Sequence, residues 1–110
     1  METKIINVAK DFSRYPHGRH KKYSHTSGER FRDDLLIPLL EDNIVIINFT
    51  GVEGVSSGFL EEVFGGLVRL GYNKEGLLKR IKIGYEGDPS VAAEVKQYIM
   101  EADYVGTVGS

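Results

Sequence analysis

The sequence contains no cysteine and no long apolar run. The absence of cysteine excludes disulfide bridges, thiol catalysis and thiolate metal sites, and it is typical of a cytoplasmic protein. No apolar run approaches the roughly 20 residues that a membrane-spanning helix needs. The N-terminal segment METKIINVAKDF lacks the long apolar stretch of a secretory signal. We therefore expect a cytoplasmic protein that does not enter a membrane.

Length and composition predict one globular domain. The 110 residues are 41% hydrophobic and 27% charged, which is typical of a folded protein rather than a disordered one. A chain of this size buries about two thirds of its unfolded surface in a single core. Because no internal repeat and no linker interrupts the chain, we expect residues 1–110 to form a single domain.

Positive charge is concentrated in one segment, although the formal net charge is only −2. Residues 14–25 contain four Arg or Lys residues and three His but no acid. Two interpretations stay open, a solvated loop or a patch that binds phosphate, nucleic acid or an acidic partner. In the binding interpretation the cations contact phosphate and two tyrosines stack on bases: Arg14, Arg19, Lys21, Lys22, Tyr15 and Tyr23. The sequence pI of 5.9 argues against nucleic acid.

The first half of the chain predicts a strand, a loop and a helix. Residues 4–8 supply a first strand, and a short edge strand is expected around residues 21–23, where lysine discourages edge pairing. Thr26 and Glu29 have the spacing of a capping box, so a helix should begin there. Its apolar residues recur at helical spacing: Phe31, Leu35, Leu36, Leu39 and Leu40.

The most informative segment is residues 43–71. Residues 44–47 are apolar and β-branched, which favours a strand buried on both faces. A glycine-containing loop follows, and Ser56 and Ser57 lie where the next helix begins. That helix has an apolar face and should end at Gly71; its apolar residues are Phe59, Leu60, Val63, Phe64, Leu67, Val68 and Leu70.

The last third of the chain predicts one more strand and one more helix. We expect residues 73–78 to be a connection. Residues 80–86 should form a strand, because apolar and polar residues alternate there, and this strand should either expose one face to water or lie near an edge of the sheet. Asp88 as N-cap and Pro89 as first helical residue should start the third helix. The residues from Tyr104 onward are either a weak edge strand or a frayed tail. This order of strands and helices favours an α/β fold.

The serine turn resembles that of the bacterial anti-sigma factor antagonists, which are STAS domains. Ser56, Ser57, Gly58 and Phe59 align with the two serines, the glycine and the apolar residue of that turn, while Val55 replaces the antagonists' aspartate. Residues 28–32 and 57–68 are similar to a STAS-like family of uncharacterised bacterial proteins, and the likeness extends over nearly the whole chain. It implies a STAS-like α/β fold, with a mixed sheet of about four strands and about three helices packed on it.

The resemblance also implies a regulatory, non-enzymatic role. Members of the family occur beside or fused to ATPases of the histidine-kinase type, so the implied partner is such an ATPase or a serine kinase. In the antagonists the serine at this turn is phosphorylated, which makes Ser56, by alignment, and Ser57 the candidate phosphorylation sites. The alternative is that Ser56 only caps the helix, since serine satisfies an orphan backbone N–H there. The sequence leaves both roles, and the oligomeric state, open.

The presence of two adjacent glycines inside the second helix requires an explanation, because glycine destabilises a helix interior. Gly65 and Gly66 cost about 2 kcal/mol relative to alanine, which indicates close approach by a partner or by another part of the chain. The face away from the apolar stripe is the candidate partner surface, together with the turn: Gly58, Glu61, Glu62, Gly65 and Arg69.

Other chemistries have weaker support. His17, His20 and His25 are spaced closely enough to bind a metal, but histidines in a polar loop usually do not. The segment GYEGDP at residues 84–89 lacks the Lys-Ser/Thr of a phosphate-binding loop. No nucleophile elbow is present. The sequence therefore predicts no catalytic residues, no metal and no cofactor.

Overall fold

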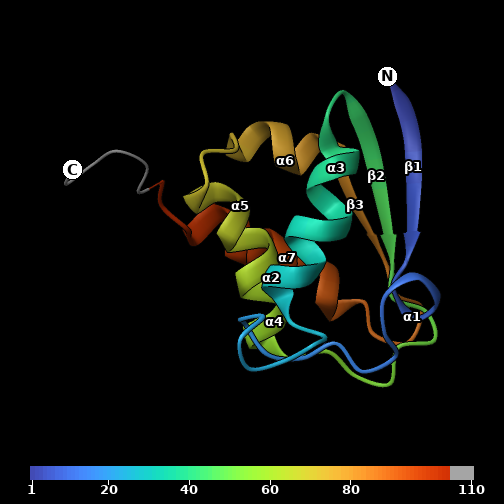
Figure 1. The fold of residues 1–110 in the computed structure, drawn as a ribbon. Helices are drawn as coiled ribbons and strands as arrows, with labels where there is room; N and C mark the ends of the chain where they lie inside the picture. The colour runs from blue at the N-terminus through green and yellow to red at the C-terminus, as the bar shows by residue number, and fades with distance from the viewer. Residues whose placement is uncertain (105–110) are drawn as a thin grey trace.

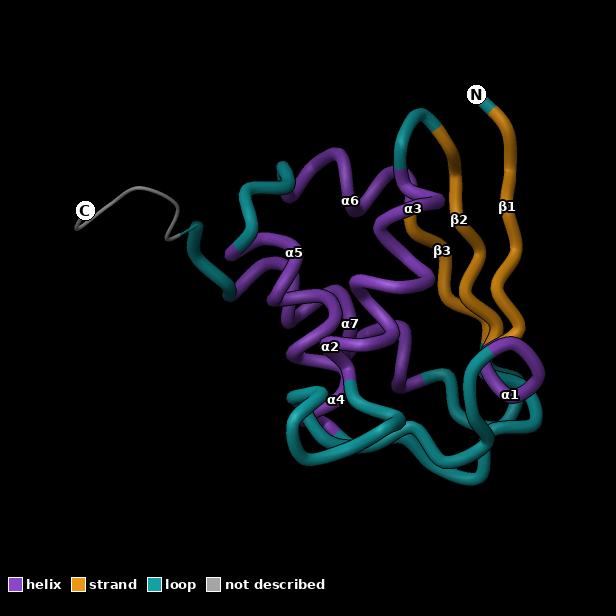
Figure 2. Tube along the Cα trace, viewed as in Figure 1, coloured by secondary structure: helices purple, strands orange, loops and turns teal. Residues whose placement is uncertain are grey.

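A three-stranded sheet forms one side of the molecule and helices form the other (Figure 1). The computed structural model describes residues 1–104. Strands β1 (Glu2–Asn7), β2 (Asn43–Asn48) and β3 (Ile81–Gly84) are parallel and lie in the order β1-β2-β3. When successive parallel strands are added in one direction, right-handed crossovers put every connecting helix on the same face of the sheet. Figure 2 shows the helices that follow residue 27 gathered on that face.

The described residues form five helical segments, two of which contain a π-helical stretch. The first is α1 (Val8–Asp11), and the last two are α6 (Lys74–Arg80) and α7 (Ser90–Glu101). The α2–α3 helix, residues 28–40, joins α2 (Gly28–Arg30), a π-helical stretch (Phe31–Leu36) and α3 (Ile37–Leu40). The α4–α5 helix, residues 57–69, joins α4 (Ser57–Leu60), a π-helical stretch (Glu61–Gly65) and α5 (Gly66–Arg69) in the same way.

The hydrophobic core lies between the helices and one face of the sheet. Ile47 pairs with Ile6 on one side and with Ile83 on the other, and their side chains point toward the helices. Phe64 of the α4–α5 helix has no exposed surface. The predicted core positions of this helix are therefore confirmed except for Leu70, which is 55% exposed.

Within residues 1–104 the opposite face of the sheet is uncovered, contrary to the expectation of a strand buried on both faces. Ile5 is 60% exposed and pairs with Ile46, which is half-buried. The apolar run in β2 therefore reflects burial against helices on one side and an open apolar surface on the other. Among residues 1–104, no helix combines the length and the apolar character that crossing a membrane requires.

The observed element counts correct the prediction of a mixed sheet of about four strands with about three helices. The described sheet has three strands, all parallel, and five helices pack with it. Residues 21–23 form turns rather than an edge strand, because the N–H groups of Tyr23 and Ser24 both donate to the carbonyl of His20, at 3.0 and 3.1 Å. The alternatives stated for the C-terminal tail concern residues 105–110, which lie outside the described residues.

Residues 73–78 are mostly helical and not a connection. Asn73 Oδ1 accepts from the Gly76 N–H at 2.9 Å and caps α6. At α7 the expected cap is displaced by one residue, since Pro89 occupies the N-cap position and Asp88 Oδ1 accepts from the Ser90 N–H at 3.0 Å. Gly71 ends the α4–α5 helix with φ of 108°, as predicted.

The start of the first long helix also differs by one residue from the predicted capping box. Ser27, not Thr26, is the cap, because Ser27 Oγ accepts from the Arg30 N–H at 3.1 Å. The Thr26 hydroxyl donates instead to the carbonyl of Tyr15, and Glu29 accepts from the Lys21 N–H. The side chains that were expected to cap the helix thus hold the preceding loop.

The two long helices approach closely at Gly28. A Cβ atom on Gly28 would lie 2.5 Å from the backbone oxygen of Phe59. We expect Gly28→Ala to lower the free energy of unfolding by about 1 to 3 kcal/mol, because the backbones must move apart. Gly76→Ala is the matched control: its Cβ would meet only Asn73 atoms, the nearest at 3.7 Å, so it should be neutral or stabilising by up to about 1 kcal/mol. Urea denaturation of both variants checks this, and equal effects would contradict the proposed contact.

Candidate functional site

The two serines of the turn have different surroundings. Ser56 Oγ accepts from the Phe59 N–H at 3.1 Å and from the Gly18 N–H at 3.3 Å, and the residue is half-buried. Ser56 is therefore a helix cap, and its oxygen is also held by the basic segment. Ser57 is exposed and lies on the side of α7. Of the two hydroxyl groups, that of Ser57 is the more accessible.

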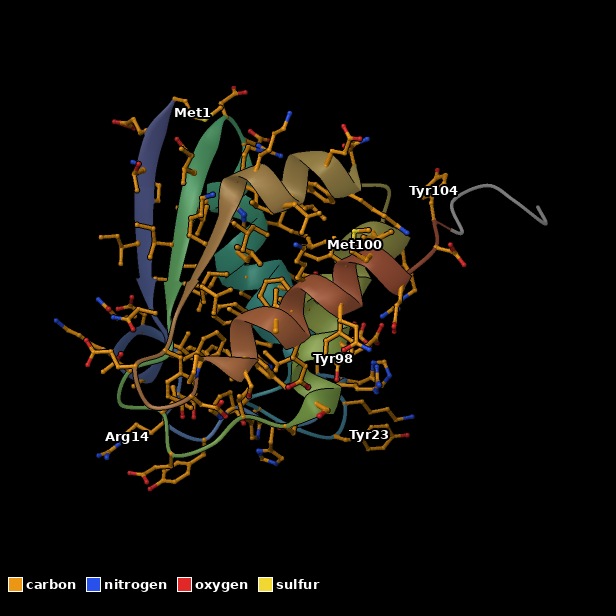
Figure 3. All side chains as sticks on the ribbon, turned by 180° about the vertical axis from the view of Figure 1, so that it is seen from behind. Met1, Arg14, Tyr23, Tyr98, Met100 and Tyr104 are labelled. Atoms are coloured by element: carbon orange, nitrogen blue, oxygen red, sulfur yellow. The ribbon has the colours of Figure 1, made fainter. Side chains whose placement is uncertain are left out.

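Tyr98 of α7 lies beside Ser57. Its hydroxyl donates to Glu94 Oε2 at 2.7 Å. This hydrogen bond raises the pKa of Tyr98 above its ordinary value, although a hydrogen bond with Ser57 partly opposes the change. Figure 3 shows Tyr98 on the outward side of α7. The serine turn, α4 and α7 therefore present one continuous surface.

Residues 14–25, here called the basic loop, fold over the serine turn. The carbonyls of Gly18 and Arg19 accept from the N–H groups of Gly28 and Glu29, both at 2.9 Å. The Arg19 side chain lies along the first turn of α4, since a Cβ on Gly58 would be 3.6 Å from Arg19 Cγ. Backbone bonds thus hold the loop at the start of the α2–α3 helix, while the Gly18 N–H and the Arg19 side chain hold it against the serine turn.

A network of ion pairs continues from the basic loop along the α4–α5 helix. Arg19 Nη1 lies 2.5 Å from Glu61 Oε1 and 3.7 Å from Glu62 Oε1. Arg69 bonds the other oxygen of Glu61 at 2.7 Å. Arg32, from the facing helix, bonds Glu62 Oε2 at 2.9 Å and also donates to the Glu62 carbonyl. Each of the two glutamates is therefore held by more than one arginine.

The network changes the pKa values of its members. Burial raises the pKa of Glu61, but hydrogen bonds and charge from Arg69 and Arg19 outweigh it, so the net pKa lies below the ordinary value of 4.5. The pKa of Asp33 is also lowered, because Arg32 and Lys21 outweigh the effect of burial. The side chain of Arg32 is only 8% exposed, and its pKa is raised by Asp33 and Glu62 despite burial.

These pKa changes predict an acid-sensitive contact. A carboxylate with a lowered folded pKa stabilises the fold above its unfolded pKa, and the contribution is lost as the pH falls through the folded pKa. We expect the free energy of unfolding to decline below about pH 4.5, and Glu61→Gln to be less stable at pH 7 but to decline less steeply. Glu75→Gln, at an exposed position without an ion pair among residues 1–104, is the control and should give a curve parallel to that of the unmodified protein. Denaturation between pH 7 and pH 3 measures all three curves.

The adjacent glycines are explained within the chain. A Cβ on Gly66 would collide with the guanidinium of Arg32, and one on Gly65 would collide with Glu61. Both glycines are buried. The structure thus places Gly65 beneath the ion-pair network, where it cannot contact a partner directly, while Gly58, Glu61, Glu62 and Arg69 are partly exposed around it.

Most of the basic loop's charge is paired within the molecule. Arg14 bonds Glu53 at 2.7 Å, Arg19 bonds Glu61, and Lys21 lies 3.5 Å from Asp33. Lys22 lies over the ring of Tyr23, 5.6 Å from its centroid. A phosphate ligand would have to replace three existing ion pairs, which weakens the nucleic-acid interpretation.

A hollow of about 340 Å³ opens next to Ser56. Its lining comes from the basic loop and from the loop before α4: Tyr15, Pro16, His17, Glu53, Gly54 and Ser56. No group of three or more potential metal-ligating side chains occurs among residues 1–104. The hollow and the exposed ring of Tyr15 in its lining together form a concave surface with aromatic character.

Sequence reasoning missed Arg32 and Tyr98. Arg32 lies in a polar stretch of the sequence, so nothing in its spacing indicated burial, although Gly66 signalled that something approaches the second helix closely. Tyr98 follows Val91 and Val95 at the spacing of an apolar helical face, but it is half-buried and its hydroxyl bonds Glu94.

Comparison with known proteins gives one match. A family model described as a STAS-like domain of unknown function matches residues 27–89. The matched region includes the α2–α3 helix, β2, the serine turn and the α4–α5 helix. No curated protein and no solved structure matches the chain.

Proposed function

Because the chain belongs to the family of STAS-like domains of unknown function, we propose that it is a non-enzymatic regulatory module whose serine turn binds a protein partner. The partner is a serine kinase or a histidine-kinase-like ATPase, as the resemblance to the anti-sigma factor antagonists implies. Phosphorylation at the turn controls the binding. The chain and that partner meet in the cytosol.

The observation that carries the proposal is the exposed position of Ser57 at a helix start, where its side chain bonds only to Tyr98 among the described residues. The helix N-terminus favours negative charge, and Arg19 lies along the same turn. Ser57, rather than the aligned Ser56, is the phosphate acceptor because Ser56 Oγ already accepts two N–H groups under the basic loop. The kinase transfers the γ-phosphoryl group of ATP: a bond forms between Ser57 Oγ and phosphorus, ADP leaves, and the hydroxyl proton passes to a base of the kinase.

The phosphate changes the surface by competing for Arg19. A phosphoserine carries about −1.5 to −2 charges at pH 7, whereas Glu61 carries one. Arg19 is the member of the network nearest the turn and is 46% exposed at its side chain, so it can turn from Glu61 toward Ser57. Glu61 keeps Arg69 as its partner. Phosphorylation thus alters the surface charge and breaks the Arg19–Glu61 ion pair that fixes the basic loop, without disturbing the core.

Substitutions at the two serines test the proposal. Ser57→Asp should leave the fold intact and weaken binding to the proposed partner, a serine kinase or a histidine-kinase-like ATPase, by about tenfold, or about 1.4 kcal/mol. Ser57→Ala should bind normally. Ser56→Asp is the matched control, since aspartate also caps a helix and should leave binding nearly unchanged. Isothermal titration calorimetry measures the affinities, and unaltered binding by Ser57→Asp would refute the switch.

A further inference from the structure

Within residues 1–104, strand β3 has one edge without a partner strand. Among the described residues β3 pairs only with β2. On its other edge, alternate backbone N–H and C=O groups are therefore available to an added strand. Helix α7 packs beside β3, and in Figure 3 it lies toward the viewer, to one side of the sheet.

A groove of about 250 Å³ lies between this edge, α6 and α7. Its apolar lining consists of Leu78, Ile81, Ile83, Ala92, Val95 and Ile99. Leu78 and Ile83 are half-buried and Ala92 is exposed, so apolar surface of both the strand and the helix is accessible from the groove. The volume suits the side chains of a short segment better than a large ligand.

The charge of the groove is entirely positive. The remaining lining residues are Lys82 and Lys96, and no acid lines the groove. Both lysines are exposed, and neither forms an ion pair within residues 1–104. This contrasts with the basic loop, where Arg14, Arg19 and Lys21 are paired with acids.

We propose that this groove binds an extended segment of a partner protein in which apolar and acidic residues alternate, and that the segment adds to β3 as a fourth strand. Its backbone bonds the open edge of β3. Because side chains alternate between the faces of a strand, its apolar residues enter the groove beneath α7, while its acidic residues lie on the opposite face. Lys82 lies on that opposite face, beside Ile46, and pairs directly with the acidic residues there, whereas Lys96, on α7 at the groove, adds positive charge from the apolar side.

The charges select against two other occupants. A second copy paired through β3 would bring the unpaired lysines of both copies together, which is unfavourable. Residues 105–110 of the chain itself, VGTVGS, contain no acidic side chain to pair with them. This site is separate from the serine turn, so its test is independent of the proposed function.

A labelled peptide of alternating valine and glutamate tests the proposal on the full chain by fluorescence anisotropy. We expect saturable binding with a Kd below about 1 mM. The matched peptide of valine and lysine should bind at least about tenfold more weakly. A valine–glutamate peptide with N-methyl groups on alternate amides, which removes the donors facing β3, should lose binding to the same degree.

The double variant Lys82→Glu/Lys96→Glu should reverse the preference, so that the lysine peptide binds more tightly. Thermal unfolding of the variant confirms that it is folded. Three results would each overturn the proposal: no binding of the glutamate peptide up to about 1 mM, equal binding of the N-methylated peptide, or an unchanged preference in the double variant. Hydrogen exchange that shows all β3 amides protected in the free protein would also overturn it, because the edge would then already be occupied.

Discussion

Phe64→Ala should lower the free energy of unfolding by about 3 to 5 kcal/mol. Phe64 is fully buried on the face of the α4–α5 helix that packs into the core. The substitution removes a large apolar side chain and leaves a cavity that the surrounding residues fill only in part. A loss of this size is a large fraction of the stability of a small protein. Denaturant unfolding, followed by circular dichroism, measures the loss.

Ile5→Ala is the matched control for this prediction. Ile5 is apolar but 60% exposed on the uncovered face of the sheet. Its truncation should cost less than about 1 kcal/mol, because little buried surface is lost. If Phe64→Ala also cost less than about 1 kcal/mol, the α4–α5 helix would be rotated and its outward face wrongly assigned.

Arg32→Met should lower the free energy of unfolding by about 3 kcal/mol. The Arg32 side chain is 8% exposed and that of Glu62 is 13% exposed, so methionine leaves a nearly buried carboxylate without its closest partner. Arg19 and Arg69, at 3.7 and 3.8 Å from Glu62, compensate only in part. Methionine keeps most of the volume, so the loss reports charge rather than packing. Denaturant unfolding measures it.

Arg30→Met is the control in the same helix. Arg30 pairs with Asp34 at 3.5 Å, and both side chains are substantially exposed. Loss of such a surface pair costs about 0 to 1 kcal/mol. The double variant Arg32→Met/Glu62→Leu should recover part of the loss, because replacing both charges removes the buried unpaired group. Equal losses for Arg30→Met and Arg32→Met would contradict the buried network.

The parts of the structure that were predictable from sequence are those set by local pattern. β2, the cap at Ser56 and the apolar face of the α4–α5 helix follow from β-branched residues, from serine before an apolar run and from helical spacing. Helix α6 differs from the predicted connection because its 7 residues are too few to show an apolar period.

The arrangement around the serine turn could not be predicted in the same way. The contacts of Gly18 with Ser56 and of Arg19 with Glu61 join residues about 40 positions apart and leave no periodic trace in the sequence. The same holds for Arg32 and Glu62, which meet only because the two long helices cross near Gly28 and Gly66. The roles of these residues depend on tertiary packing, which a single sequence does not encode in local pattern.

The most direct test of the central claim is the position of the phosphate. The purified protein is incubated with ATP and with the proposed partner, a serine kinase or a histidine-kinase-like ATPase, and the modified residue is identified by tandem mass spectrometry. The account predicts one phosphate on Ser57, with Ser57→Ala unmodified and Ser56→Ala still modified. Phosphate on Ser56 alone, or on neither serine, would contradict the claim that the exposed hydroxyl of Ser57 is the switch.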